Sequence, residues 1–335
     1  MDPHDRRALK AAARNSLAAA PYDPKKIILL HTAVTCAVSL LVTLFDYILS
    51  MQIANTGGLS GLSTRSFLST TQSVLLLLVV VVLPFWEAGY RFASLRMARE
   101  QEAAPHSLLE GFRRFGPLLR ASLLQLLIYC GAGIACFFLS SQIFALTPLS
   151  DPLYKLIEAL SLDTTLMESE LVLDEATLLA IMDAYVPMLL IFLVLLLVVL
   201  LVISYRFRMV NFLLLDHPGM KAAEALRMSR YQLRGHKAAL FRLDLSFLWF
   251  YGLQLAASVL AYGDYILAYL NVPLPISADA AFFVFLILSL VCQCGLYVWV
   301  RNRVDVTYAK FYCLTALTDR KDGASEPRPN PKINF

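Results

Sequence analysis

Six long apolar stretches dominate the sequence and limit the folds open to it. Each contains about 20 largely apolar residues, the length at which a helix crosses the roughly 30 Å hydrocarbon core of a bilayer. A helix is needed there because the hydrocarbon core offers no partner to an unpaired backbone group. The sequence therefore predicts six membrane-spanning helices, at residues 27–51, 72–91, 118–144, 185–204, 240–262 and 280–300.

The composition also indicates a membrane protein. Hydrophobic residues make up 58% of the chain and charged residues 16%, whereas soluble domains have roughly 45–50% apolar and about 25% charged residues. Basic clusters in such a chain point to lipid headgroups or to the rule that places positive charge inside the cell. We therefore expect anionic lipid, and no nucleic acid, among its partners.

The basic residues are distributed unevenly, and this predicts the orientation of the chain. Of the 29 Lys and Arg residues, only Arg65 and Lys155 fall in the connections that follow odd-numbered spans. Lys and Arg near span ends are retained on the cytoplasmic side, so both termini are predicted to be cytoplasmic. The connection between the third and fourth spans is instead acidic, with Asp151, Glu158, Asp163, Glu168, Glu170, Asp174 and Glu175. We interpret it as a solvated outer surface, because it lacks the spacing and the turn glycine of a calcium loop.

Two segments repeat each other at an offset of 114 residues, counted from Leu108 to Ala222. The apolar positions Leu108, Phe112, Phe115 and Leu119 correspond to Ala222, Leu226, Ser229 and Leu233, and the charged positions Glu110, Arg113 and Arg120 correspond to Glu224, Arg227 and Arg234. Internal repeats of this kind define the architecture of a chain. We predict an all-α membrane protein of three repeated units, each an amphipathic helix followed by a membrane hairpin.

This interpretation divides the single membrane domain, residues 1–335, into consecutive segments. They are a cytoplasmic amphipathic segment at 1–26, a first hairpin at 27–104, a second unit at 105–215, a third unit at 216–317 and a disordered cytoplasmic tail at 318–335. The tail is assigned from its polar, proline-containing composition. A helix near residues 5–17 places Leu9, Ala13 and Leu17 beside basic residues and can lie on the inner leaflet.

Amphipathic segments supply the candidate binding residues. In the third unit Ala222, Leu226, Ser229 and Leu233 share one helical face, and a basic stripe lies beside them. Such a helix is built for an interface, either with anionic headgroups or with another membrane protein. The candidates for lipid or partner binding are Arg113, Arg114, Arg120, Arg227, Arg230, Arg234 and Lys237.

Pro84 lies inside the second predicted span. A proline there removes a backbone hydrogen bond and kinks the helix, which neighbouring helices in a membrane tolerate. The kink could be a hinge or a broken-helix binding site. A static kink is the interpretation we favour, because proline is common in membrane spans.

Ionisable residues inside spans are costly and usually functional. Asp46 and Asp183 fall near the outer ends of their spans, and Glu87 and Asp244 near the inner ends. Ion-coupled carriers bind near the midplane, so these positions argue against that class. Glu87 also stands four residues before Arg91, a spacing that favours a helical ion pair.

Near the midplane the sequence offers amides instead, namely Gln125, Gln254 and Gln293. They could line a path, together with Pro84 and Glu87, or they could hold helices together by hydrogen bonds. We favour the second role.

The cysteines and histidines give no sign of a catalytic or metal site. Cys36, Cys130, Cys136, Cys292 and Cys294 lie within spans and Cys313 lies beyond the last one, so we expect no disulfide framework, no metal and no cofactor. None of the five histidines stands in a nucleophilic or metal-binding motif. Asp216–His217 most resembles an acid–base pair, but we interpret it as the polar turn before a helix that begins near Pro218. We therefore expect no enzyme.

Several short motifs carry a family resemblance over nearly the whole chain. In the third unit they are Asp216, His217, Pro218, residues 222–226, Ser229, Gly235, Lys237, Phe241 and residues 245–247. Elsewhere they are Arg7, Leu9, Lys10, Ala13, Arg14, Leu17, Pro84, Gly89, Thr307, Ala309, Phe311 and Tyr312. Together they resemble the bacterial domain-of-unknown-function family 975. The chain departs from that family at Trp249–Phe250, where the family usually has Gly-Trp, and at Asn302–Arg303, where it has Pro-Tyr.

The resemblance implies a multi-pass protein of the bacterial plasma membrane and supplies no activity. The function we predict is that of a membrane scaffold or lipid-interacting accessory protein. The alternatives are a passive or lipid-handling transporter with a path between the repeats, and a membrane enzyme that acts through His217 or His236.

Overall fold

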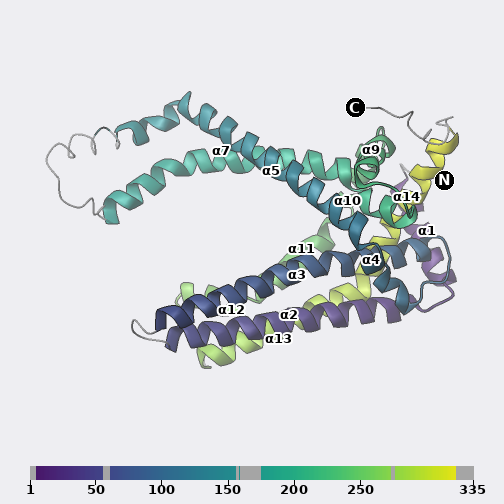
Figure 1. The fold of residues 1–335 in the computed structure, drawn as a ribbon, viewed down its shortest axis with the longest axis horizontal. Coiled ribbons are helices and arrows are strands. Elements are labelled where there is room, and N and C mark those ends of the chain that lie inside the picture. Colours follow the sequence, from purple (N-terminus) through teal and green to yellow (C-terminus); the bar gives the residue numbers. More distant parts are fainter. Residues whose placement is uncertain (1–4, 56–60, 156–157, 159–174, 273–275, 322–335) are drawn as a thin grey trace. The chain divides into compact units, whose positions relative to one another are not determined.

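The computed structural model describes residues 5–55, 61–155, 158, 175–272 and 276–321. These residues form helices and loops, with no strand among them, so the predicted all-helical fold is confirmed for this part of the chain (Figure 1). The long helices are α2 (Pro24–Asn55), α3 (Gly61–Ala98), α5 (Phe115–Ala145), α7 (Glu175–Phe207), α13 (Ala278–Leu296) and α14 (Asn302–Lys321). The short ones are α1 (Arg6–Ala19), η1 (Pro105–Leu109), α4 (Glu110–Arg113), η2 (Pro148–Ser150), α8 (Val210–Asp216), α9 (Ala222–Gln232), α10 (Lys237–Leu245), α11 (Leu248–Leu260), α12 (Gly263–Tyr269) and η4 (Tyr297–Arg301).

Within the described residues, five helices are long and apolar enough to cross a membrane. They run over Pro24–Gln52, Ser66–Ala98, Phe115–Ala145, Met182–Asp216 and Asp279–Ala316. The remaining predicted span, 240–262, is a pair of helices, α10 and α11, bent by 53°. If this pair crosses as one span, the number of spans reaches the predicted six. The helix α3 continues through Pro84.

The bend between α10 and α11 falls where the N-terminal helix contacts them. The Ser246 hydroxyl donates to the Leu243 carbonyl at 2.6 Å, and the Lys10 ammonium donates to the Ser246 carbonyl at 3.3 Å. The same ammonium lies 4.1 Å from the centre of the Phe247 ring. A helix can kink where a side chain forms a hydrogen bond with a main-chain carbonyl and so interrupts the helical hydrogen bonds. Lys10 therefore stabilises the bend.

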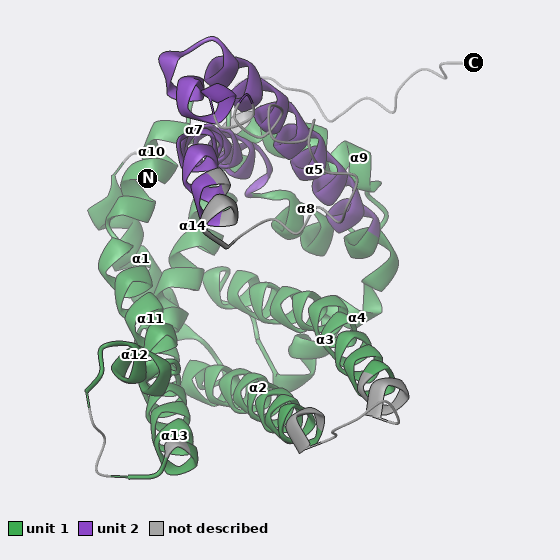
Figure 2. Cartoon of the chain, turned by 90° about the vertical axis from the view of Figure 1, so that its left-hand side faces the viewer, with its two compact units in different colours: residues 1–119, 209–335 green, residues 120–208 purple. Residues whose placement is uncertain are grey.

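The chain divides into two compact units, residues 1–119 with 209–335 and residues 120–208 (Figure 2). In the second, α5 and α7 form a hairpin in which the Phe137 and Phe192 rings meet edge to face. Phe144 and Ala184 join one small buried cluster near its end. The predicted segment 105–215 is thus shared between the two units. The acidic positions 163, 168, 170 and 174, the loop 56–60 and residues 322–335 of the predicted tail lie outside the described residues.

The best-packed part of the first unit is a group of helices at one end of its spans. We call this group the base and define it as α1, η1, α4, α8, α9 and α14. Its buried apolar side chains include Leu9, Ala13, Leu108, Met209, Leu214, Leu215, Ala225, Leu233, Val306, Ala309, Phe311 and Tyr312. By contrast, no residue in the most apolar window of α3 is buried by the protein. The base, rather than the most apolar part of α3, supplies the compact core of this unit.

The N-terminal helix α1 belongs to the base. Asp5 caps it by accepting hydrogen bonds from the backbone of Arg7 at 2.9 Å and Ala8 at 3.2 Å. Its apolar face, with Leu9 and Ala13, is buried in contact with α14. That face was expected to lie on the inner leaflet. The protein covers it instead, because α14 presents a matching apolar side.

Two glycines allow η1 and α4 to approach the backbone of α3. A Cβ atom added to Gly89 would lie 1.8 Å from the Leu108 carbonyl oxygen, and one added to Gly111 would lie 1.9 Å from the Phe85 carbonyl oxygen. Both obstacles are backbone atoms, which cannot move aside as a flexible side chain can. The contact therefore requires glycine at both positions.

Candidate functional site

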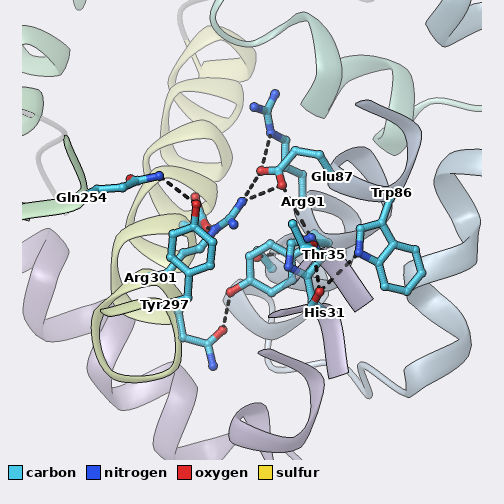
Figure 3. A network of polar contacts seen from close by, with 12 residues as sticks. His31, Thr35, Trp86, Glu87, Arg91, Gln254, Tyr297 and Arg301 are labelled. Atoms are coloured by element: carbon cyan, nitrogen blue, oxygen red, sulfur yellow. Dashed lines mark hydrogen bonds and ion pairs between the residues drawn. The ribbon is translucent and has the colours of Figure 1, made fainter. Parts of the chain in front are cut away.

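The candidate site is a network of charged and polar side chains where α2, α3 and η4 meet (Figure 3). At its centre Arg301 Nη2 donates to both carboxylate oxygens of Glu87 at 2.5 Å. Arg91 Nε lies 3.9 Å from Glu87, one helical turn away. The predicted Glu87–Arg91 pair is therefore present, but the shorter contact comes from Arg301, 214 residues along the chain. The ion pair joins two spans.

A π-helix places Arg301 in this network. The segment Tyr297–Arg301 is π-helical. The π-helix is rare in proteins, and where it occurs it is often at a functional site. The Arg301 guanidinium lies 4.6 Å from the Tyr297 ring centre and 5.2 Å from that of Tyr90, and its Nε donates to Asp305 at 3.2 Å. Two carboxylates and two aromatic faces thus surround one cation. Such surroundings offset the cost of holding a charge inside a membrane protein.

His31 fills the opposite side of the network. Its side chain is 1% exposed, and its Nε2 atom lies 3.5 Å from Glu87 Oε2. The imidazole stacks on Trp86 with ring centres 5.7 Å apart and lies 4.5 Å from the Tyr90 ring. The His31 carbonyl accepts hydrogen bonds from Thr35 Oγ1 at 2.9 Å and from Trp86 Nε1 at 3.4 Å. These contacts fix α2 against one face of α3.

A polar relay connects this network to the start of α2. Tyr90 donates to Asn302 Oδ1 at 2.7 Å, and Asn302 Nδ2 donates to the Pro24 carbonyl at 2.9 Å. Tyr90 is fully buried, and Asn302 is nearly so. Three separate segments of the chain are thereby joined through two side chains. The arrangement fixes the relative register of α2, α3 and α14.

The network is balanced in charge. It contains the carboxylates Glu87 and Asp305 and the guanidinium groups Arg91 and Arg301, together with His31. Opposite charges that neutralise each other in this way suit a structural clamp between helices. None of the side chains named here is a hydroxyl or thiol paired with a base as a nucleophile would be.

A second cluster lies in the base and explains Asp216. Both Asp216 carboxylate oxygens accept hydrogen bonds from Arg99 at 2.6 Å, and Tyr312 donates to the same carboxylate at 3.0 Å. The Asp216 hydrogen bond raises the pKa of the Arg99 guanidinium. His217 is 3.8 Å away and half exposed. Asp216 thus accepts hydrogen bonds from Arg99 and Tyr312, and these bonds connect the end of α3 to α8 and α14.

The predicted basic residues fall into three groups. Arg227, Arg230, Arg234 and Lys237 are exposed along α9 and the start of α10. Arg113 is exposed and pairs with Glu110, whereas Arg120 is exposed in the other compact unit. Arg114 is different. Its guanidinium is mostly buried and donates to Glu110 at 3.1 Å and to the carbonyls of Leu214 and Leu215, so it completes the C-terminal end of α8.

The helix α9 has the amphipathic character predicted for it. Ala222, Leu226, Ser229 and Leu233 are all buried, and the basic residues beside them are exposed. The corresponding segment of the second unit differs in conformation, because it forms the 3-10 helix η1 and the single turn α4.

The residues proposed to line a path also have definite positions. Gln254 Nε2 donates to the Tyr297 hydroxyl at 2.7 Å, and Gln293 Nε2 donates to Ser289 Oγ at 3.1 Å. Ser289 in turn donates to the Ala257 carbonyl at 2.7 Å, so these bonds join α11 to α13 and η4. Pro84 is exposed on α3, and Gln125 lies in the other unit.

Sequence reasoning did not find Arg301, Asn302 or His31 as members of one network. One local signal pointed to this network. His31 lies inside a predicted span and Arg301 directly follows another, and ionisable residues are costly in such positions. Their partners are distant in sequence.

The helices and the network together define a multi-pass helical membrane protein. The chain belongs to the family described as "Protein of unknown function (DUF975)", whose model matches residues 1–320. This confirms the resemblance drawn from the sequence motifs. No curated protein and no solved structure matches the chain.

Proposed function

We propose that the protein is a membrane scaffold that binds anionic phospholipid headgroups through a basic surface. We define this surface as Arg227 and Arg230 on α9, Arg234 in the turn that follows, and Lys237 at the start of α10. The observation that carries the proposal is that all four side chains are exposed while the other face of α9 is buried in the base. The same surface could also receive an acidic membrane protein partner.

The surroundings of the basic surface suit a headgroup boundary. Exposed aromatic side chains lie on the same stretch of chain, at Tyr231, Phe241 and Trp249, and aromatic rings favour the membrane–water interface. Each basic residue near an anionic membrane surface contributes about 1 kcal/mol of attraction. Four of them would favour anionic over zwitterionic lipid by about 4 kcal/mol before screening.

The location and topology belong to the same proposal. We place the protein in the bacterial plasma membrane with both termini and the base on the cytoplasmic side, because Lys and Arg concentrate there. The three repeated units stay a proposal, supported by the matching residue pattern at 105–120 and 222–234. We also propose that the protein is not an enzyme, since Asp216 is engaged by Arg99 and Tyr312.

Transport has less support. Gln254 on α11 donates a hydrogen bond to Tyr297 on η4, and Gln293 donates one to Ser289, whose hydroxyl in turn donates to the Ala257 carbonyl on α11. This favours the role of holding helices together over the role of lining a path.

A triple variant tests lipid binding, with Arg227, Arg230 and Arg234 changed to Gln. We expect its preference for phosphatidylglycerol over phosphatidylcholine to fall about 100-fold, since three basic residues contribute about 3 kcal/mol. The measurement is the amount of each lipid retained by the purified protein in native mass spectrometry after exchange from mixed micelles.

The matched control removes the same charge elsewhere. Arg6, Arg7 and Arg14 are exposed on α1, and changing them to Gln should leave most of the preference intact. Equal losses in both triple variants would show that net charge alone attracts the lipid and would refute a specific surface on α9.

A further inference from the structure

Two thiols from distant parts of the chain meet inside the first unit. The Sγ atoms of Cys36 on α2 and Cys294 on α13 are 2.9 Å apart, although the residues are 258 positions apart in sequence. All six cysteines are free in the structure. A disulfide has an S–S distance of about 2.05 Å, so the two sulfurs need to approach by less than about 1 Å. The geometry places an oxidisable pair between two spans.

The apolar surroundings of Cys36 and Cys294 determine which class of oxidant can reach them. Cys36 lies within the span Pro24–Gln52 and Cys294 within Asp279–Ala316, at a depth that charged, water-soluble thiols such as glutathione do not enter. Such thiols are what keeps cytosolic cysteines reduced. The redox state of this pair is therefore governed by carriers that dissolve in lipid.

We propose that Cys36 and Cys294 form a redox-active dithiol that a lipid-soluble quinone oxidises to a disulfide. As the S–S bond forms, the two thiols release two protons and two electrons, and the quinone takes up both to become a hydroquinone. The thiolate needed for this reaction is disfavoured in an apolar environment. The contact between the two sulfurs keeps the second thiol beside the first, so the S–S bond can form once one thiol has lost its proton to the quinone.

The disulfide would act as a latch beside the charged network. The Cys294 carbonyl accepts a hydrogen bond from the backbone N–H of Tyr297, the first residue of the π-helix that ends at Arg301. Cys36 follows Thr35, whose hydroxyl donates to His31 in the same network. A covalent bond at this position would hold α2 and α13 together and would restrain the segment that carries Arg301.

The test uses the full chain in lipid nanodiscs, reduced with a phosphine and then exposed to decylubiquinone. This quinone is fully substituted and has no open ring position for a thiol to add to. Free thiols are counted with a maleimide after unfolding, and cysteine peptides are mapped by mass spectrometry. We expect the number of free thiols to fall from six to four, with the Cys36 and Cys294 peptides joined.

The matched control is Cys292, which lies two residues from Cys294 on the same helix. Cys292→Ser should lose two thiols as the wild type does, falling from five to three, whereas Cys36→Ser should keep all five. Six remaining thiols in the wild type, a quinone adduct, or a bond through Cys292 would overturn the proposal. The wild-type result alone is decisive, so the conclusion does not depend on the folding of any variant.

Discussion

Replacing Gly89 with Ala is expected to separate η1 and α4 from α3 and to lower the free energy of unfolding by about 3 kcal/mol. The added Cβ would lie 1.8 Å from the Leu108 carbonyl oxygen. Real Cβ atoms do not come this close to a backbone atom, so the contact must break or both backbones must shift. Gly111→Ala should have a similar effect, because its Cβ would meet the Phe85 carbonyl at 1.9 Å.

The measurement is unfolding in mixed micelles of increasing SDS content, followed by the fluorescence of the tryptophans, which include Trp86 one turn before Gly89. The control is Gly131→Ala on α5, where an added Cβ meets nothing within 4 Å. Alanine there should be neutral or should stabilise the helix by up to about 1 kcal/mol. If Gly89→Ala were as stable as Gly131→Ala, the close approach of α3 and η1 would be wrong.

The second large effect is expected from Glu87→Leu. Arg301 is 14% exposed and would keep Asp305 as its remaining carboxylate partner. Removing one member of a buried ion pair costs about 3–5 kcal/mol, and we expect the lower value because the Glu87 side chain keeps an exposure of 32%. The same SDS titration measures the loss.

Two further variants separate the ion pair from the rest of the network. Arg91→Leu should cost less than about 1 kcal/mol, since Arg91 is 3.9 Å from Glu87 and partly exposed. Glu87→Leu combined with Arg301→Leu should be less destabilising than the sum of the two single changes, with a coupling energy of about 1–3 kcal/mol. Strict additivity would contradict a direct Glu87–Arg301 contact.

The spans could be predicted from the sequence because a run of apolar residues is local information. The same holds for α9, where the spacing of Ala222, Leu226, Ser229 and Leu233 identified the side that is buried. The bend at Ser246 could not be predicted in this way. The bend coincides with a contact from Lys10, which is 236 residues away in the chain. No local residue pattern indicates that these two residues meet.

The charged network shows the same limit. The sequence correctly paired Glu87 with Arg91, four residues away, but did not pair it with Arg301. Arg114 was grouped with the exposed arginines because its neighbours in sequence suggested an amphipathic helix. In the structure the local turn is tight, and the Arg114 side chain points toward the end of α8. Side-chain direction in such a short element depends on tertiary packing that the residue pattern does not record.

The contact between α1 and α14 has a consequence for how the protein is made. Leu9 is buried in contact with a helix that contains Phe311, so α1 leaves the ribosome long before the helix that covers it. At about 5–20 residues per second, the roughly 300 residues between them take about 15–60 s to synthesise. During that time the first hairpins are inserted without the core of the base. Completion of the base thus has to follow the synthesis of α14.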